Sequence, residues 1–349
     1  HCNDWQTALI PTLIRAAEDN FWAQTRTVMA VHDLTEQGRY PQAILSQLGL
    51  PESLMNEQNL QLGDGVSLLK GGVQHADAVT VPSPSYAAEV RTERYGEGLD
   101  DAFRSLAKPV LGVRYGIDTA VWNPTTSELL KANYTQDNFA KRHVCRDDLL
   151  KRFGLSRTER RPLFAALAPL NRASGMDLVA AVADDIVALG GQLIVVGVGD
   201  EKLRDRFLGI ASRLQGSVAA HIADDVALQH VVLAGADAVL LPHRRQPCGL
   251  VQMRAMAYGA VPIAHATGGL RDTVIDATAA HLKAGTATGF CFREPTPQAL
   301  IGAIKQALKF RTERRGDWRK LMLNGMSRDF SWDVPAAEYE TLYKSLFSS

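Results

Sequence analysis

The stretch DAVLLPHRRQPCGLVQMRAMAYGAVPIAHA, residues 237–266, decides the fold. It begins and ends with short apolar runs, 237–242 and 260–266, and such uninterrupted hydrophobicity indicates strands that are buried on both faces. Between them the chain turns through Pro247 and Gly249 into an apolar segment of helical character. Two such strands joined by a helix form a right-handed βαβ crossover, so the sequence predicts a parallel sheet covered by helices.

The same alternation of apolar runs and amphipathic segments occupies the second half of the chain. Runs at 162–168, 192–200 and 218–223 each precede a segment of helical length. The first hundred residues are less regular, but they are also predicted to be α/β. There we expect the N-terminal residues to lie already in a helical segment, strands at 26–33, 77–83 and 109–116, and helices near 5–18, 65–76 and 84–92.

The length of 349 residues is enough for two domains with cores of their own. A linker that contains Pro and Thr begins near residue 115, where we place the boundary. The expected organisation is a first domain over 1–114, a second over 115–333 and a closing helix within 334–349. Because the pattern is already under way at His1, the first domain is expected to continue upstream and to be incomplete at its N-terminus.

Composition excludes several classes of function. Lys and Arg total 38, as do Asp and Glu, and no basic arm stands out, which argues against nucleic acid as a partner. No apolar run has the length of a membrane span, so direct membrane insertion is not expected. The four cysteines lack C-x-x-C spacing, which favours free thiols over a disulfide scaffold or a zinc site: Cys2, Cys145, Cys248 and Cys291.

The turn in the opening stretch has the features of an anion-binding site. A helix that starts after Pro247 and Gly249 offers free backbone N–H groups to an anion. The residue before this proline is Gln246, however, so no carboxylate stands beside the turn. Glycines at 197–199 and 267–269 also let the backbone approach a ligand, but any βα turn needs glycines, and a purely structural role stays open for them.

Seven stretches resemble the glycogen and starch synthases in order and spacing: HCNDW, LLKGGVQHADAVTVPSPSYAAEV, YGIDTAVWNP, GVGD, LAGADAVLLPHRRQPCGLVQ, YGAVPIAHATGGLRDTV and ATGF. The resemblance implies the GT-B fold, in which two Rossmann-like parallel-sheet domains face each other across a cleft. It further implies retaining transfer of glucose from ADP-glucose to the 4-OH of an α-1,4-glucan, without a metal. HCNDW and GIDTAVWNPTT are closest in style to plant and algal soluble starch synthases, which implies a plastid, and otherwise the cytoplasm.

The charged side chains that the family places around the donor are replaced in this chain. APLNRASGMD (168–177) matches the family pattern S-R-L-x-x-Q-K-G-[LI]-D, which puts Pro169 at the arginine and Ser174 at the lysine. Losing two charged hydrogen bonds costs about 3–6 kcal/mol of diphosphate stabilisation. Gln246 replaces the glutamate of F-E-P-C-G-L, and Leu233 replaces the aromatic residue near the nucleotide base.

The resemblance also implies a set of site residues. The expected catalytic positions are His1, which matches the family histidine at the donor sugar, and the degenerate Gln246. No metal and no cofactor are expected, and ADP-glucose would be the donor substrate only if the protein is active. The expected donor-binding residues are Gly197, Gly199, Cys248, Gly249, Leu250, Thr267, Gly268 and Gly269.

Two hypotheses of function follow from these replacements. The first is a synthase-like pseudoenzyme, impaired or inactive, that is retained as a binding or structural subunit with α-glucan or other protein subunits. The alternative is a working glucosyltransferase in which Arg172, Arg244 or Arg245 replaces the lost cations. A third possibility, a Rossmann dehydrogenase, is disfavoured, because no G-x-G-x-x-G follows a first strand with an acid about 20 residues on.

Overall fold

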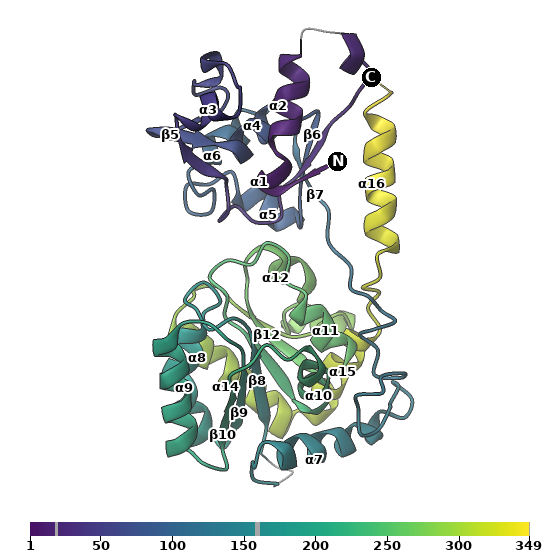
Figure 1. Cartoon of the computed structure of the whole chain (residues 1–349). Coiled ribbons are helices and arrows are strands. Elements are labelled where there is room, and N and C mark those ends of the chain that lie inside the picture. Colours follow the sequence, from purple (N-terminus) through teal and green to yellow (C-terminus); the bar gives the residue numbers. More distant parts are fainter. Residues whose placement is uncertain (18–19, 158–160, 349) are drawn as a thin grey trace. The chain divides into compact units, whose positions relative to one another are not determined.

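The computed structural model describes residues 1–17, 20–157 and 161–348 (Figure 1). The chain divides into two compact units, His1–Tyr115 with Asp333–Ser349, and Gly116–Trp332. Each unit contains a parallel sheet with helices packed on it, so the predicted α/β fold class is confirmed.

The sheet of the unit 116–332 has six parallel strands in the order β10-β9-β8-β11-β12-β13. Five of them are the predicted apolar runs, each shorter than its run because the ends belong to the turns. The sixth was missed, since three residues carry no periodic signal. The strands are β8 (Leu163–Leu167), β9 (Gln192–Val196), β10 (Val218–His221), β11 (Ala238–Leu241), β12 (Val261–His265) and β13 (Phe290–Phe292).

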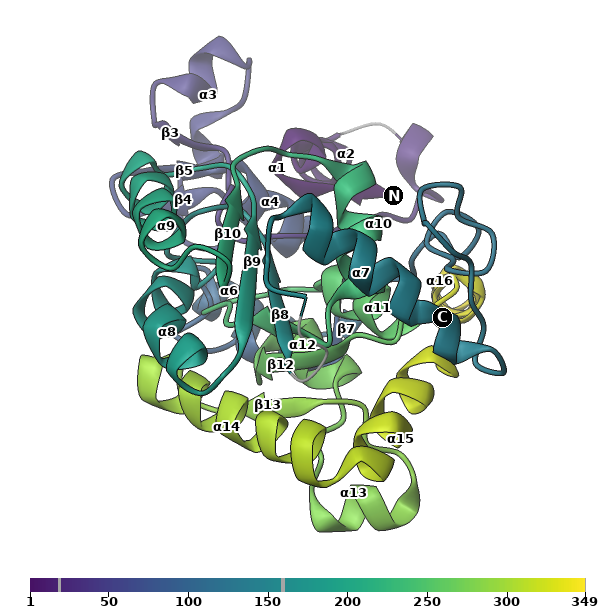
Figure 2. The ribbon, with the colours of Figure 1, turned by 90° about the horizontal axis from the view of Figure 1, so that it is seen from below.

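Helices cover both faces of this sheet. Figure 2 shows α8 and α9 on one side and α7 and α10 on the other. Alternate strand residues serve two separate cores: Phe164 packs with α8, α9 and α14, whereas Ala165 packs with α7, α10 and α11. The helices are α7 (Arg142–Arg152), α8 (Met176–Ala188), α9 (Glu201–Arg213), α10 (Val226–Gly235), α11 (Val251–Ala257), α12 (Gly268–Thr273), α13 (Ala279–Ala284), α14 (Pro297–Glu313) and α15 (Arg315–Met326).

The other unit contains a four-stranded parallel sheet in the order β1-β2-β6-β7 and a small antiparallel sheet β3-β5-β4, which the sequence did not predict. The strands are β1 (Cys2–Asn3), β2 (Val28–Ala30), β3 (Arg39–Pro41), β4 (Gln61–Leu62), β5 (Gly65–Ser67), β6 (Ala78–Val81) and β7 (Val110–Gly112). The helices are α1 (Asp4–Thr7), α2 (Leu9–Ala16), α3 (Ile44–Gln47), α4 (Leu68–His75), α5 (Pro84–Glu89), α6 (Asp100–Arg104) and α16 (Asp333–Ser345).

Two predicted helix starts in this unit were wrong. The first residues are not helical, because Cys2 pairs with Met29 in a parallel ladder and α1 begins only at Asp4. The helix predicted from residue 65 begins at Leu68, because residues 65–67 form β5 and the Ser67 hydroxyl caps the helix by accepting from the Lys70 N–H at 3.2 Å. The predicted 5–18 helix is divided into α1 and α2, and its residue 18 lies outside the described residues.

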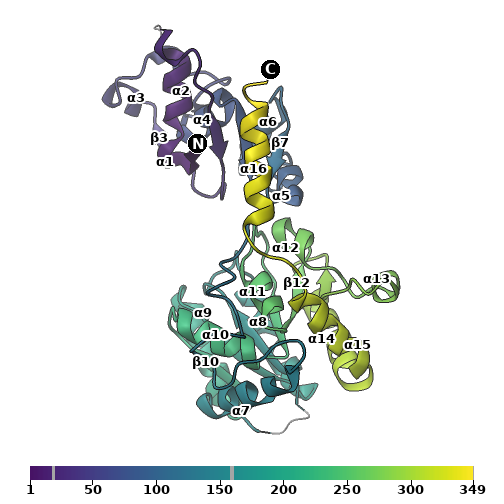
Figure 3. The ribbon, with the colours of Figure 1, turned by 90° about the vertical axis from the view of Figure 1, so that its right-hand side faces the viewer.

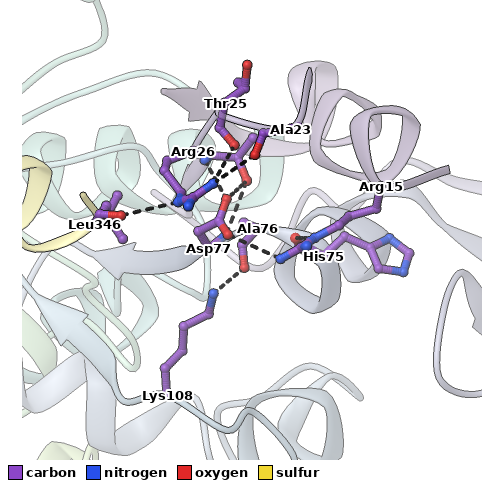
Figure 4. A network of polar contacts seen from close by, with 10 residues as sticks. Arg15, Ala23, Thr25, Arg26, His75, Ala76, Asp77, Lys108 and Leu346 are labelled. Atoms are coloured by element: carbon purple, nitrogen blue, oxygen red, sulfur yellow. Dashed lines mark hydrogen bonds and ion pairs between the residues drawn. The ribbon is translucent and has the colours of Figure 1, made fainter. Parts of the chain in front are cut away.

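A network of polar contacts connects the segments that precede β2 and β6 (Figure 4). The Asp77 carboxylate, just before β6, accepts from the Thr27 N–H and hydroxyl at 2.7 and 3.0 Å and pairs with Arg15 at 3.1 Å. Arg26 donates to the carbonyl of Leu346 at 3.2 Å. This last contact fastens the chain that follows α16 to the unit.

The C-terminal helix α16 packs on the same sheet, beside β7 (Figure 3). Its Leu342 is buried against Val28 of β2 and Ala78 of β6. The helix predicted to close the chain therefore belongs, by its packing, to the unit that contains the N-terminus.

Candidate functional site

The strand order of the unit 116–332 creates a topological switch point between β8 and β11. From β8 the chain steps outward through β9 to β10, and from β11 it steps the other way through β12 to β13. Ligands of open α/β sheets bind at the carboxyl ends of the strands where the order reverses. Six of the eight predicted donor-binding residues lie in the loops after β9, β11 and β12, and the other two, Gly268 and Gly269, are the first residues of α12. Pro169 and Ser174 lie in the loop after β8.

The loops after β8 and β9 pack directly on each other. A Cβ added at Gly197 would lie 2.0 Å from the carbonyl oxygen of Ala168, and one at Gly199 (φ +150°) would lie 2.5 Å from that of Leu170. The Leu170 N–H donates to the carbonyl of Val198 at 2.7 Å. Loop packing therefore requires both glycines, whatever ligand they also approach.

The turns after β11 and β12 interlock. A Cβ at Gly268 (φ +43°) would lie 2.1 Å from the carbonyl oxygen of Gln246, and one at Gly269 would lie 1.7 Å from that of Cys248. The Gly269 N–H donates to the carbonyls of Gln246 and Pro247 at 3.0 and 3.1 Å. This N–H thus serves the fold, and the two predicted donor turns form one rigid piece of backbone.

A buried polar network that sequence reasoning missed lies beneath the two turns. Gln252 has no exposed surface, and its amide nitrogen donates to the Cys248 carbonyl at 3.2 Å and to the Thr273 hydroxyl at 3.1 Å. The Thr273 hydroxyl donates in turn to the Gly269 carbonyl at 2.6 Å. The only signal in the sequence was a glutamine inside VQMRAMA, a segment in which Arg254 is the one other polar residue.

Two buried histidines lie at the ends of the neighbouring strands β11 and β12. His265 is 1% exposed, with Nδ1 2.6 Å from the His243 carbonyl and Nε2 2.9 Å from the Arg293 carbonyl. The pKa of His243 is lowered to about 4, mainly by burial and to a smaller extent by the nearby His265, against a backbone hydrogen bond to Leu241 that raises it, so the His243 ring is neutral at pH 7. Within the described ranges no three His, Cys, Asp or Glu side chains are grouped to hold a metal ion.

Arg244 is held by a carboxylate from the start of α8. Its Nη1 and Nη2 lie 2.7 and 2.8 Å from the two oxygens of Asp177, and Nη1 also donates to the carbonyl of Arg172. The Arg172 side chain is exposed and makes no ion pair with the described part of the chain. Of these two candidate replacement cations, only Arg172 is therefore available to a ligand.

The replaced positions offer no compensating charge. Pro169 is exposed, and Ser174 is buried with its N–H donating to the Asn171 side chain at 2.7 Å. Leu233 has no exposed surface and packs in the core with α7 and α10. Gln246 is half-buried at the turn itself, as are Cys248 and Leu250, which also belong to the predicted donor-binding set.

His1 belongs to the other unit, where its ring contacts α16. Its Nδ1 lies 2.6 Å from the Tyr343 hydroxyl oxygen, and its ring centroid lies 5.4 Å from that of Tyr339. A partner from α16 was not foreseen, because 342 residues separate His1 from Tyr343.

Known proteins match both units. Residues 1–105 match the family model described as the starch synthase catalytic domain, and residues 148–321 match glycosyl transferases group 1. Glycogen synthase 1 of Rhizobium meliloti (strain 1021) is 40% identical over 348 residues, which cover 100% of this chain and 72% of that protein. The chain belongs to the glycogen and starch synthase family. The glycogen synthase of Anaeromyxobacter sp. (strain Fw109-5) is 39% identical over 99% of this chain and 72% of its own length.

The comparison with solved structures agrees with the family assignment and with the fold. The catalytic domain of starch synthase IV from Arabidopsis thaliana, bound to ADP and acarbose, superposes with a TM-score of 0.92 at 33% identity, covering 100% of this chain and 73% of that one. Sucrose-phosphate synthase from Thermosynechococcus elongatus, at 23% identity and a TM-score of 0.62, shares the fold alone. The GT-B fold class predicted from the family resemblance is confirmed.

These matches over nearly the whole chain to proteins named glycogen synthase agree better with the glucosyltransferase hypothesis than with the binding or structural subunit. In the described ranges none of the helices has both the length and the apolar composition needed to cross a bilayer.

Proposed function

We propose that this protein transfers glucose from a nucleotide sugar to the 4-OH of an α-1,4-glucan, at a turnover lowered by the replacement of three charged donor-site residues. The observation that carries the proposal is the interlocked pair of turns at 246–250 and 267–269, which lies at the switch point where the family binds its donor. In this proposal the unit 116–332 binds the donor, and the unit with His1 serves the acceptor side.

The similarity to the plant starch synthase suggests the ligands. That protein is bound to ADP and to acarbose, an α-glucan analogue, so ADP-glucose and an α-glucan are the proposed donor and acceptor. Arg172 is the proposed cation for the diphosphate. Gln246 orients the sugar by hydrogen bonding but cannot balance positive charge at the anomeric carbon. Missing two charged hydrogen bonds, at about 1.5–3 kcal/mol each, lowers turnover by roughly two to four decades.

The test combines binding with transfer, on the full chain. ADP and ADP-glucose are titrated by calorimetry, and labelled glucose from ADP-glucose is followed into glycogen over long incubations. A variant that restores the family side chains, Pro169→Arg with Ser174→Lys and Gln246→Glu, should transfer at least a hundredfold faster than the wild type. Absence of transfer by both the wild type and a folded restored variant would remove the proposal.

A second function, a binding or structural subunit without transfer, is favoured by one observation: the Arg244 guanidinium is already neutralised by Asp177. It predicts no heat from ADP up to millimolar concentration, while binding to glycogen or to other protein subunits persists. A glucose transfer that His1→Ala abolishes would exclude it.

The location of this protein in a plastid is also a proposal. The plastid rests on two short stretches that resemble plant enzymes, whereas the two bacterial relatives share 40% and 39% identity with nearly the whole chain. Fractionating cells that express the full-length gene with a C-terminal tag tests it.

A further inference from the structure

A polar cavity of about 440 Å³ lies in the unit 116–332, outside the loops described above. It is open to solvent and is lined by residues of the segments 117–125 and 135–137, by the end of α11 at Ala257 and by the end of α15 with the residues up to 330. None of its lining residues belongs to the loops after β8, β9, β11 or β12. Since α11 starts at the interlocked turns and ends at this cavity, the two sites lie at opposite ends of one helix.

The floor of the cavity is rigid and apolar. The Ile117 N–H donates to the carbonyl of Phe330 at 2.8 Å, which joins the two segments that line it. The Trp122 ring is stacked on His230 at 4.0 Å, and the Arg254 guanidinium lies 4.0 Å from the Trp122 ring centre. Two groups that each lie 4.0 Å from the ring centre cannot both occupy the same face of an indole. Both faces of Trp122 are therefore covered, and only its edge meets the cavity.

The walls carry many hydrogen-bonding groups but no net charge. Asp137 and Arg328 are the only charged side chains, and they cancel. The side chains of Gln136 and Asp137 are exposed and have no hydrogen-bond partner in the described residues. The remaining polar groups are the hydroxyls of Thr119, Thr125 and Thr135 and the amide of Asn123.

We propose that this cavity binds the end of a neutral saccharide. Hydroxyls and planar amides can donate to and accept from the hydroxyls of a sugar, while the apolar floor contacts its C–H groups. The volume lies within the range of about 300–1,000 Å³ typical of small-ligand sites. A nucleotide fits worse, because both faces of Trp122 are covered and Arg328 is the single cation among the lining residues.

The occupant would contact both connections between the two units. Ile117 lies just after the end of the first segment of the unit 1–115, and Phe330 lies just before Asp333, where that unit resumes. The choice of an α-1,4-linked saccharide as ligand rests on the proposed function, whereas the preference for a neutral saccharide rests on the lining alone.

The test uses maltotriose as the probe and the full chain as the protein. Calorimetric titrations compare the wild type with Gln136→Ala, Asp137→Ala and the matched control Gln306→Ala, which changes an exposed glutamine of α14. Because all three side chains are exposed and make no described hydrogen bonds, we expect every variant to fold. The two cavity variants should bind maltotriose about fivefold or more weakly, and Gln306→Ala should bind like the wild type.

A parallel titration with ADP separates this inference from the proposed function. Unchanged ADP affinity with weaker maltotriose binding in the two cavity variants supports the inference, and the same saccharide result without any ADP binding supports it while removing the proposed donor site. Equal maltotriose affinity in all four proteins, or no maltotriose binding by the wild type, would overturn it.

Discussion

Arg244 and Asp177 form a two-pronged ion pair across 67 residues of sequence, with contacts of 2.7 and 2.8 Å. The pair joins the loop after β11 to the first turn of α8, and both side chains are partly exposed, at 25% and 32%. A guanidinium engaged in this way is a structural brace, so its positive charge is not offered to a diphosphate.

This pairing separates two arginines that look equivalent in the sequence. We expect Arg172→Ala to weaken ADP binding about tenfold, because its exposed guanidinium has no carboxylate partner in the described structure. Arg244→Ala should change ADP affinity less than twofold and lower the free energy of unfolding by about 1 kcal/mol. Calorimetry and urea unfolding measure the two effects, and the reverse order of ADP affinities would contradict this assignment.

The Gln252–Thr273 network should hold the donor turns in place. Thr273→Val removes the hydroxyl that joins Gln252 to the Gly269 carbonyl, and leaving such buried groups unpaired costs about 1–3 kcal/mol. We expect lower thermal stability and weaker ADP binding, with both restored in Thr273→Ser, which keeps the hydroxyl. Loss of stability without any change in ADP affinity would show that the network supports the fold alone.

We expect the carboxylate of Asp237, just before β11, to contribute strongly to the free energy of unfolding. Its carboxylate accepts from the Leu163 N–H at 2.8 Å and pairs with Arg146 and Arg311 at 2.6 and 2.9 Å. Burial raises the pKa of this carboxyl, but the two guanidiniums and the N–H outweigh that effect, and the net shift is downward. Asp237→Asn leaves both cations without their partner, which should cost about 3–5 kcal/mol in urea unfolding at pH 7.

The pH dependence of that difference has a definite sign. A lowered carboxyl pKa contributes stability that is fully present above the unfolded pKa of about 3.9 and is lost as pH falls through the folded value. The gap between the wild type and Asp237→Asn should therefore stay constant from pH 7 to about pH 5 and close only in stronger acid. A gap that closes near neutral pH would rule out this explanation.

His243 should act in a different pH window. The folded pKa of about 4 lies below the unfolded value of about 6.5, so the unfolded state binds a proton first as pH falls. The wild type should lose up to about 3 kcal/mol between pH 6.5 and pH 4 through this group. His243→Gln cannot titrate and should flatten that part of the stability curve, as measured by urea unfolding at several pH values.

The parts of the fold that the sequence predicted are those with long signals. Buried parallel strands such as β8 and β9 appear as continuous apolar runs, and the helices between them are long enough to show their period. β1 has only two residues, and the apolar run of β13 is limited to Phe290–Phe292 and is followed at once by Arg293 and Glu294, so neither strand stands out in the sequence. The antiparallel sheet β3-β5-β4 lies in a polar segment, where pairing depends on the rest of the unit.

For the candidate site, the sequence located the loops but not their contacts. The turn around Pro247 and its glycines follow from local chemistry, whereas the ion pair of Arg244 joins distant residues and needs the folded sheet. Gln252 was missed for the same reason, because a polar residue in a largely apolar helix does not reveal which groups it contacts.

The interlock of Gly268 and Gly269 with the carbonyls of Gln246 and Cys248 limits how this protein can be redesigned. Neither Gly268 nor Gly269 can accept a side chain while the turn at 246–250 keeps its path. A change of donor preference therefore calls for transplanting residues 246–250 and 267–269 as one cassette, taken together from a single parent.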